Sequence, residues 1–122
     1  MDGMILADIP GLIEGASTGK GLGFNFLRHI ARTKILAHCI SVESLDIKKD
    51  YLLIRKELGL YDKNLLDKKE IILLTKSDLA DEKIIKGQIK KLQKLNKTVL
   101  PVSIYDWDKF KKLRSYLINI RL

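Results

Sequence analysis

Polar residues that could bind a ligand follow three short apolar runs of the sequence. Asp8-Ile9-Pro10-Gly11 follows one run, Thr75-Lys76-Ser77-Asp78 follows another, and Ser103-Ile104-Tyr105 follows the last. A carboxylate such as that of Asp78 can accept hydrogen bonds from N1–H and from the exocyclic amine of guanine, whereas adenine offers no such pair of donors. The alternative for Asp78 is a helix cap, because it stands where a predicted strand leads into a helix.

The elements that must position these residues alternate between apolar runs and amphipathic patterns. We predict strands at Met4–Ala7, Ile35–Val42, Ile71–Leu74 and Val99–Val102. We predict helices at Phe24–Arg32 and around Asp50–Leu60, Ile85–Leu92 and Phe110–Leu117. Unbroken apolar strands between amphipathic helices indicate a doubly wound α/β domain, with a mainly parallel sheet and helices on both faces. Since ligands bind at the carboxyl ends of such strands, we expect Asp8, Asp78 and Ser103 to converge there.

The length and composition favour one soluble domain. The chain has 122 residues, of which 46% are hydrophobic and 31% charged. Its apolar runs are too short to span a membrane, and its start lacks a basic segment followed by an apolar one. Its one cysteine, Cys39, cannot form an internal disulfide. We therefore expect a cytoplasmic protein without membrane insertion, and the sequence leaves its oligomeric state open.

Five of the eight glycines lie between Gly11 and Gly23, in a stretch that looks at first like a phosphate-binding loop. The G-x-x-x-x-G-K-[ST] pattern needs four residues between its glycines and a hydroxyl after its lysine. Only three residues separate Gly15 from Gly19, and a glycine follows Lys20, so this stretch is not such a loop. Two interpretations remain: a flexible surface loop, or a switch that a terminal phosphate holds in place.

Three motifs in the first 33 residues are specific enough to compare with known families. They are D-I-P-G-L-I-E-G-A-S from Asp8 to Ser17, G-x-G-L-G from Gly19 to Gly23, and F-L-R-H-I-x-R-T from Phe26 to Thr33. This run closely resembles the switch II region of the Obg family of bacterial GTPases. The later motifs keep the order of a GTPase domain, so the resemblance covers almost the whole chain. It implies binding of GTP or GDP and Mg²⁺, hydrolysis of GTP, and a ribosomal partner, with a role in assembly of the large subunit.

The resemblance implies roles for the residues of the first motif. Asp8 would bind Mg²⁺ through water, Ile9 and Pro10 would line the nucleotide site, and Gly11 would donate its backbone N–H to the γ-phosphate. Leu12 stands where many small GTPases carry a glutamine that orients water. Because leucine cannot orient water by hydrogen bonding, we expect slow hydrolysis and no catalytic residue within the chain.

The resemblance extends to two guanine-binding motifs. Thr75-Lys76-Ser77-Asp78 matches N-K-x-D, which implies that Asp78 binds the base and that Lys76 lies along the purine. Thr75 replaces the usual asparagine and lacks the amide that contacts the base. Ser103-Ile104-Tyr105 occupies the place of Ser-Ala-x, whose backbone N–H would reach O6 of guanine. Ile104 is bulkier than the usual alanine and would crowd the base.

The family's phosphate loop and switch I have no counterpart before Asp8, which seven residues precede. We therefore interpret residues 1–122 as the distal part of an Obg-type G domain, from the switch II strand to the last helix. Losing three or four charge-assisted contacts, each worth roughly 1.5–3 kcal/mol, would lower nucleotide affinity by about three powers of ten or more. We expect these residues alone to be incompetent as a GTPase. We also expect Ile35–Leu122 to keep a βαβαβα order, with residues 1–33 loosely attached.

The net positive charge is concentrated in the second half of the chain. Residues 1–61 hold 8 Lys and Arg against 7 Asp and Glu, whereas residues 62–122 hold 15 against 8. The alternative function is therefore a non-catalytic ribosome-binding or RNA-binding remnant that uses this basic half. No stacking aromatics are interleaved among the lysines, so solvated helix faces explain the charge equally well.

Four other residues invite chemical interpretations that their surroundings do not support. His29 and His38 lack metal-ligand spacing, and no aspartate is placed to orient either ring, so we expect structural roles for both. We expect Cys39 to be a small core residue. We expect Trp107, at the start of the last helix, to be a packing anchor rather than a platform for a nucleobase.

Overall fold

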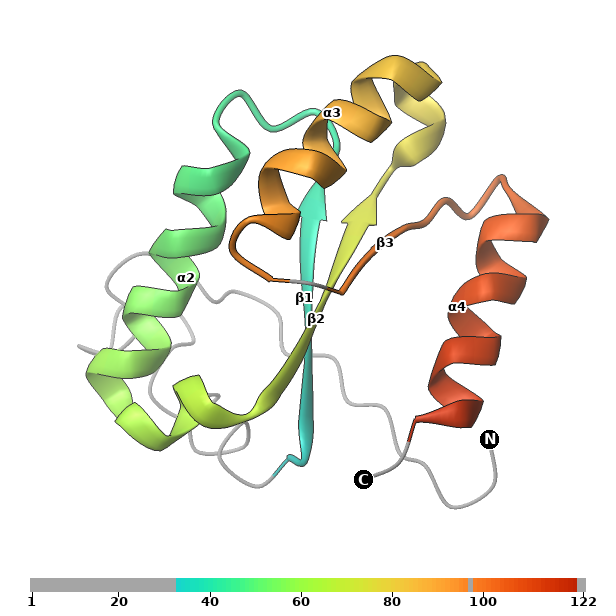
Figure 1. The fold of residues 1–122 in the computed structure, drawn as a ribbon. Helices are drawn as coiled ribbons and strands as arrows, with labels where there is room; N and C mark the ends of the chain where they lie inside the picture. Colours follow the sequence, from blue (N-terminus) through green and yellow to red (C-terminus); the bar gives the residue numbers. More distant parts are fainter. Residues whose placement is uncertain (1–32, 97, 121–122) are drawn as a thin grey trace. The chain divides into compact units, whose positions relative to one another are not determined.

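The computed structural model describes residues 33–96 and 98–120 (Figure 1). The strand predicted at Met4–Ala7 and the helix predicted at Phe24–Arg32 lie outside these residues. The described elements, with η denoting a 3-10 helix, are β1 (Ile35–Ser41), α2 (Ile47–Tyr61), η2 (Lys63–Asp67), β2 (Lys69–Thr75), η3 (Ser77–Leu79), α3 (Glu82–Gln93), β3 (Val99–Pro101) and α4 (Trp107–Asn119). The order of strands and α-helices expected for Ile35–Leu122 is observed.

The three strands form one sheet in the order β1-β2-β3. β2 and β3 run parallel, with Ile72 opposite Val99 and Leu74 opposite Pro101. The arrows of β1 and β2 point the same way in Figure 1. A parallel sheet whose strands alternate with helices confirms the predicted α/β class.

The described residues divide into two compact units. The first contains residues 37–48 and 70–120, with most of the sheet, α3 and α4. Its core includes Ile72 and Leu74 of β2 and Leu92 of α3, each with no exposed surface. Ile71 is also buried, so consecutive residues of β2 are covered, as expected of a central strand in a parallel sheet.

The second unit contains residues 33–36 and 49–69. Its apolar cluster is built on Leu58 of α2 and Leu65 of η2, with Leu36, Ile54, Tyr61 and Leu66 packed against them. Gly59 permits this packing, because a Cβ atom there would lie 2.9 Å from Cδ1 of Leu66. The chain can therefore turn back closely against the end of α2.

Aspartate caps fix the starts of the two helices of the first unit. Oδ1 of Asp81 accepts a hydrogen bond from the backbone N–H of Ile84 at 2.8 Å, at the start of α3. Oδ1 of Asp106 accepts from the N–H of Lys109 at 3.1 Å, at the start of α4. Such caps satisfy N–H groups that the first turn of a helix leaves unpaired.

A polar network joins the strands near the amino ends of β2 and β3. His38 of β1 places Nδ1 3.6 Å from Oε2 of Glu70, and both side chains are over nine-tenths buried. The amide of Asn96 donates to the backbone oxygen of Glu70 at 3.0 Å and to its Oε1 at 3.4 Å. Oδ1 of Asn96 accepts from the N–H of Thr98 at 2.9 Å. We call the edge of the sheet that carries these four residues, His38, Glu70, Asn96 and Thr98, the amino edge.

Two predictions about burial are wrong. Cys39 is exposed, because alternate residues of β1 face opposite ways and it shares a side with the exposed Ala37 rather than with Ile40. Trp107 is 63% exposed and therefore anchors no core. Helix α4 contains no fully buried residue. Among the described residues, no helix has the length and apolar character required to cross a membrane.

Candidate functional site

Backbone hydrogen bonds bring the carboxyl ends of the three strands together. The N–H of Val42, after β1, donates to the oxygen of Thr75 at 2.9 Å. The N–H of Val102, after β3, donates to the oxygen of Leu74 at 2.9 Å. The N–H of Ser77 then donates to the oxygen of Val102 at 3.1 Å. The segment after β2 is thereby tied to the segment after β3.

A side-chain hydrogen bond joins the same two segments. Oγ of Ser103 donates to Oδ1 of Asp78 at 2.7 Å, and it also accepts from the N–H of Tyr105 at 3.0 Å. Ser103 is only 7% exposed, whereas Asp78 is exposed. A buried hydroxyl therefore fixes the orientation of a carboxylate that solvent can reach. The two residues lie 25 positions apart in the sequence.

Lys76 adopts a left-handed backbone conformation, with φ of 56° and ψ of 35°. Such a conformation costs a residue with a side chain roughly 1–2 kcal/mol. The surrounding hydrogen bonds maintain it, since the oxygen of Lys76 accepts from the N–H of Leu79 at 2.9 Å. Strained residues of this kind cluster at ligand sites, and the resemblance places Lys76 at the lysine of the N-K-x-D pattern.

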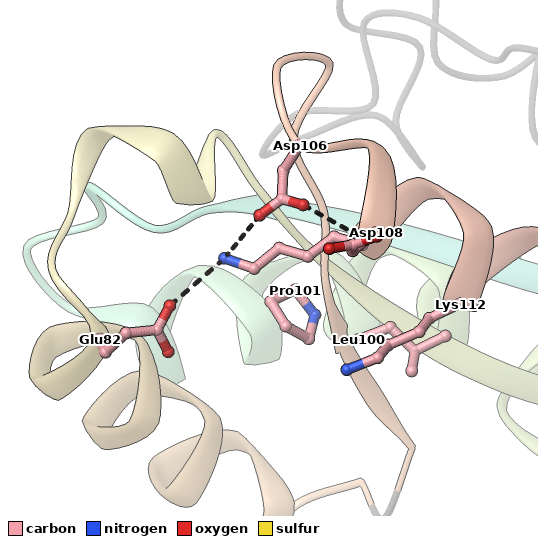
Figure 2. A pocket seen from close by; sticks show the side chains of 7 residues that line it. Glu82, Leu100, Pro101, Asp106, Asp108 and Lys112 are labelled. Atoms are coloured by element: carbon pink, nitrogen blue, oxygen red, sulfur yellow. Dashed lines mark hydrogen bonds and ion pairs between the residues drawn. The ribbon is translucent and has the colours of Figure 1, made fainter.

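Lys109 of α4 braces this turn from the side. Its Nζ donates to Oγ of Ser77 at 3.2 Å and lies 3.7 Å from Oε1 of Glu82 and 3.8 Å from Oδ2 of Asp106. Figure 2 shows Glu82 and Asp106 directed toward this ammonium group from the two sides. Ser77 is almost fully buried, so the lysine holds a residue that cannot itself face a ligand. The same side chain lines a shallow pocket with Leu100 and Pro101.

Comparison with known proteins shows which proteins the sequence is similar to. No family model matches the chain. The GTPase Obg of Karelsulcia muelleri is 44% identical over 117 residues, which cover 96% of this chain and 36% of that protein. The chain is homologous to the Obg GTPases. The GTPase Obg of Pelagibacter ubique is 43% identical over 93% of this chain, and that of Prochlorococcus marinus is 51% identical over 79% of it.

The chain spans about a third of the length of the Obg relatives it matches, since it covers 36%, 35% and 29% of these three proteins. The resemblance inferred from the switch II motif is thereby confirmed. The match to the Karelsulcia muelleri protein covers 96% of this chain, so the parallel sheet described above lies within the matched sequence.

The structure brings together some of the residues for which the resemblance implies roles in nucleotide binding. Asp78 and Ser103 are in contact, and Thr75, Lys76 and Ser77 form the turn that carries Asp78. Ile104 and Tyr105 continue from Ser103 and are 91% and 80% exposed. The predicted residues of the first motif, Asp8, Ile9, Pro10, Gly11 and Leu12, lie outside the described residues.

The alternative of a helix cap for Asp78 is wrong for α3. The cap of that helix is Asp81, whose carboxylate accepts from the N–H of Ile84. Asp78 instead lies within the short η3 turn, where its carboxylate accepts from Ser103. The carboxylate of Asp78 is therefore held by the neighbouring loop rather than by a helix terminus.

Sequence reasoning missed Lys109 and the helix caps Asp81 and Asp106. Nothing distinguishes Lys109 from its neighbours in the sequence, because Lys111 and Lys112 stand two and three positions away. Asp106 had a usable signal, since an aspartate directly before an amphipathic run is a typical N-cap. The resemblance places Mg²⁺ at Asp8, and within the described residues no group of three His, Cys, Asp or Glu side chains could hold a metal ion.

Proposed function

We propose that residues 1–122 form the guanine-recognising part of an Obg-type GTP-binding domain. The observation that carries the proposal is the 2.7 Å hydrogen bond from Ser103 to Asp78, which unites two motifs from different loops. An exposed carboxylate with a fixed orientation is the group that guanine requires, because it must accept from two neighbouring donors of the base at once.

The remaining residues of the site would complete recognition of the base. The exposed side chain of Lys76 would lie along the purine, and the backbone N–H groups after Ser103 would reach O6. The carboxylate of Asp78 rejects adenine because the adenine edge would leave it without its donors. Threonine at position 75 in place of asparagine removes one contact, so we expect weaker affinity with the preference for guanine retained.

The reaction of the whole protein would be hydrolysis of GTP by in-line attack of water. The bound Mg²⁺ would neutralise charge on the phosphates. In this chain Asp8 would hold that ion through water and Gly11 would bind the γ-phosphate. Leu12 cannot orient the attacking water, so hydrolysis would be slow without a group from elsewhere.

We further propose that the whole protein is cytoplasmic and acts with the large ribosomal subunit. The 122 residues contain no phosphate-loop motif, so they would bind GTP weakly by themselves.

Binding of nucleoside monophosphates tests the guanine site without requiring a phosphate loop. We expect millimolar GMP to shift the backbone amide resonances of residues 76–78 and 103–105 in the ¹⁵N-labelled chain. IMP, which lacks the exocyclic amine, should bind more weakly, and AMP should produce no shift in these residues. Equal shifts from AMP and GMP would contradict the proposal.

The Asp78→Ala variant assigns that binding to the carboxylate. It should abolish the preference for GMP, whereas the control Asp67→Ala removes an exposed carboxylate from the other unit and should leave GMP binding unchanged. A GMP response that survives Asp78→Ala would show that the base is recognised elsewhere.

A further inference from the structure

Two aromatic side chains at the start of α4 are exposed to solvent. Trp107 is 63% exposed and Phe110 is 46% exposed. Their rings are stacked, with centroids 5.3 Å apart and an angle of 17° between the planes. Large aromatic side chains usually contribute to a core. Here the two rings pack on each other and leave apolar area exposed at the surface, where a ligand can contact it.

The loop before α4 adds two more exposed side chains. Ile104 is 91% exposed and Tyr105 is 80% exposed, in the three positions that precede Trp107. We call Ile104, Tyr105, Trp107 and Phe110 the aromatic patch. The guanine interpretation uses the side chains of Asp78 and Ser103 and the backbone of residues 103–105, whereas the patch also offers the exposed side chains of Tyr105, Trp107 and Phe110, so substitutions of these three side chains leave the guanine-binding groups in place.

Cations accompany the aromatic patch. Nζ of Lys111 lies 5.6 Å from the ring centroid of Trp107, within the range of a cation–π contact. Arg114 follows Trp107 by seven positions and Lys111 by three, so it lies on the same side of the helix. Both cations are exposed. Helix α4 contains four Lys and Arg residues and one acidic residue, Asp108, so an anionic ligand is favoured there.

We propose that the aromatic patch, with Lys111 and Arg114, is a binding site for single-stranded RNA. Stacked rings offer flat faces to unpaired bases, and neighbouring cations bind the phosphates between those bases. Aromatic residues and arginine also occur in protein interfaces, but the cores of those interfaces are depleted in lysine, and here Lys111 lies over the Trp107 ring itself. A duplex fits less well too, because its base faces are already stacked.

Tyr105 would distinguish RNA from DNA. Its phenolic group belongs to an exposed side chain and can both donate and accept a hydrogen bond. The 2′-hydroxyl of ribose is the group by which a protein recognises RNA at a given position.

The expectation that no stacking aromatics accompany the lysines is wrong in the folded protein, because Trp107 stacks on Phe110 and lies under the ammonium group of Lys111. The helix brings Trp107 and Phe110 beside Lys111 and Arg114.

Trp107 is the only tryptophan of the chain, so its fluorescence reports directly on this site. We expect a short oligouridylate to quench the emission of Trp107, with an affinity that falls steeply as salt concentration rises. The same oligonucleotide made of DNA should bind more weakly, and Tyr105→Phe should remove that difference. Equal affinity of the unaltered chain for RNA and DNA would overturn the assignment to RNA.

Substitutions of exposed residues test which side chains bind the RNA. Phe110→Ala should weaken binding about tenfold, the loss of one stacking contact. The double change Lys111→Ala with Arg114→Ala should weaken binding. It should also reduce the slope of log affinity against log salt concentration by about two, because two phosphate contacts are lost. Circular dichroism spectra of all variants should match that of the unaltered chain.

Matched controls separate the site from general charge and general apolarity. Ile118→Ala removes an exposed apolar side chain further along α4, and Lys90→Ala with Lys91→Ala removes two exposed cations from α3. Neither control should change binding by more than about twofold. Losses equal to those of the patch variants would overturn the proposal. So would Trp107 emission that changes with protein concentration alone, because the patch would then join two copies of the chain.

Discussion

The two edges of one sheet carry polar networks of similar size but different character. At the amino edge, the side chains of His38 and Glu70 are over nine-tenths buried, and Asn96 bonds to the backbone of Glu70. At the carboxyl edge, the buried Ser103 holds the exposed carboxylate of Asp78, and the buried Ser77 directly follows the exposed Lys76. The first network keeps its functional groups inside the protein. The second presents them to solvent.

This difference separates stabilisation from recognition. A buried network contributes to the free energy of unfolding, because any member that loses its partner must remain unpaired away from water. An exposed carboxylate that loses its partner can be hydrated again at low cost. The carboxyl edge also contains the left-handed Lys76, whose conformation costs stability. We therefore expect substitutions at the amino edge to affect folding and those at the carboxyl edge to affect binding.

The largest effect on stability should come from Glu70→Ala at the amino edge. It removes a buried carboxylate that faces His38 and accepts from Asn96, and we expect it to lower the free energy of unfolding by about 2–3 kcal/mol. Urea unfolding followed by circular dichroism measures the change. Asp78→Ala, at the other edge, should cost only about 1 kcal/mol. Equal losses from the two variants would mean that the edges do not differ in this way.

A smaller effect should follow from Lys109→Met, which removes the ammonium group but keeps most of the side-chain volume. The turn of residues 76–79 loses the hydrogen bond that Nζ of Lys109 donates to Oγ of Ser77, so its amides should exchange with solvent about fivefold faster, a change of about 1 kcal/mol. GMP binding should weaken by a similar factor. Lys112→Met is the matched control, since Lys112 lines the same pocket and is exposed. If both variants change exchange equally, Lys109 does not brace the turn.

The smallest effect concerns the strain at Lys76. Glycine tolerates positive φ and alanine does not, so Lys76→Gly should be more stable than Lys76→Ala by about 1 kcal/mol or less. Thermal unfolding of the two variants measures the difference. The order should reverse at Lys86, in the middle of α3, where glycine weakens a helix by about 1 kcal/mol relative to alanine. A more stable alanine variant at position 76 would argue against a strained backbone.

Hydrophobic pattern was sufficient to predict the described strands and α-helices. β2 is a continuous apolar run because its residues are covered on both sides, and α3 repeats Ile85, Ile89 and Leu92 at helical spacing. The two 3-10 turns were missed, because turns of three to five residues have no apolar period. Burial of Cys39 was predicted wrongly because residue type does not say which side of a strand is covered.

The candidate site was predictable where a motif places the chemistry within a few residues. The segments that contain Asp78 and Ser103 could be found in this way, because each stands directly after a predicted strand. Their mutual hydrogen bond could not, since it depends on the distance between two loops. The exposure of Trp107 also could not be predicted, because it depends on how little of α4 the rest of the first unit covers.

The short strand β3 determines on which side the described sheet can grow. The residues on either side of β3 bond to β2: the N–H of Ile72 donates to the oxygen of Thr98, and the N–H of Val102 donates to the oxygen of Leu74, so along this segment every second residue faces β2. The backbone groups of Val99 and Pro101 therefore point away from β2, and proline has no N–H to donate. A further strand that paired with β3 would meet an edge of only three residues, one of which, Pro101, has no N–H to donate. At β1 it would find seven residues and no proline, so lateral extension of the described strands is directed to β1.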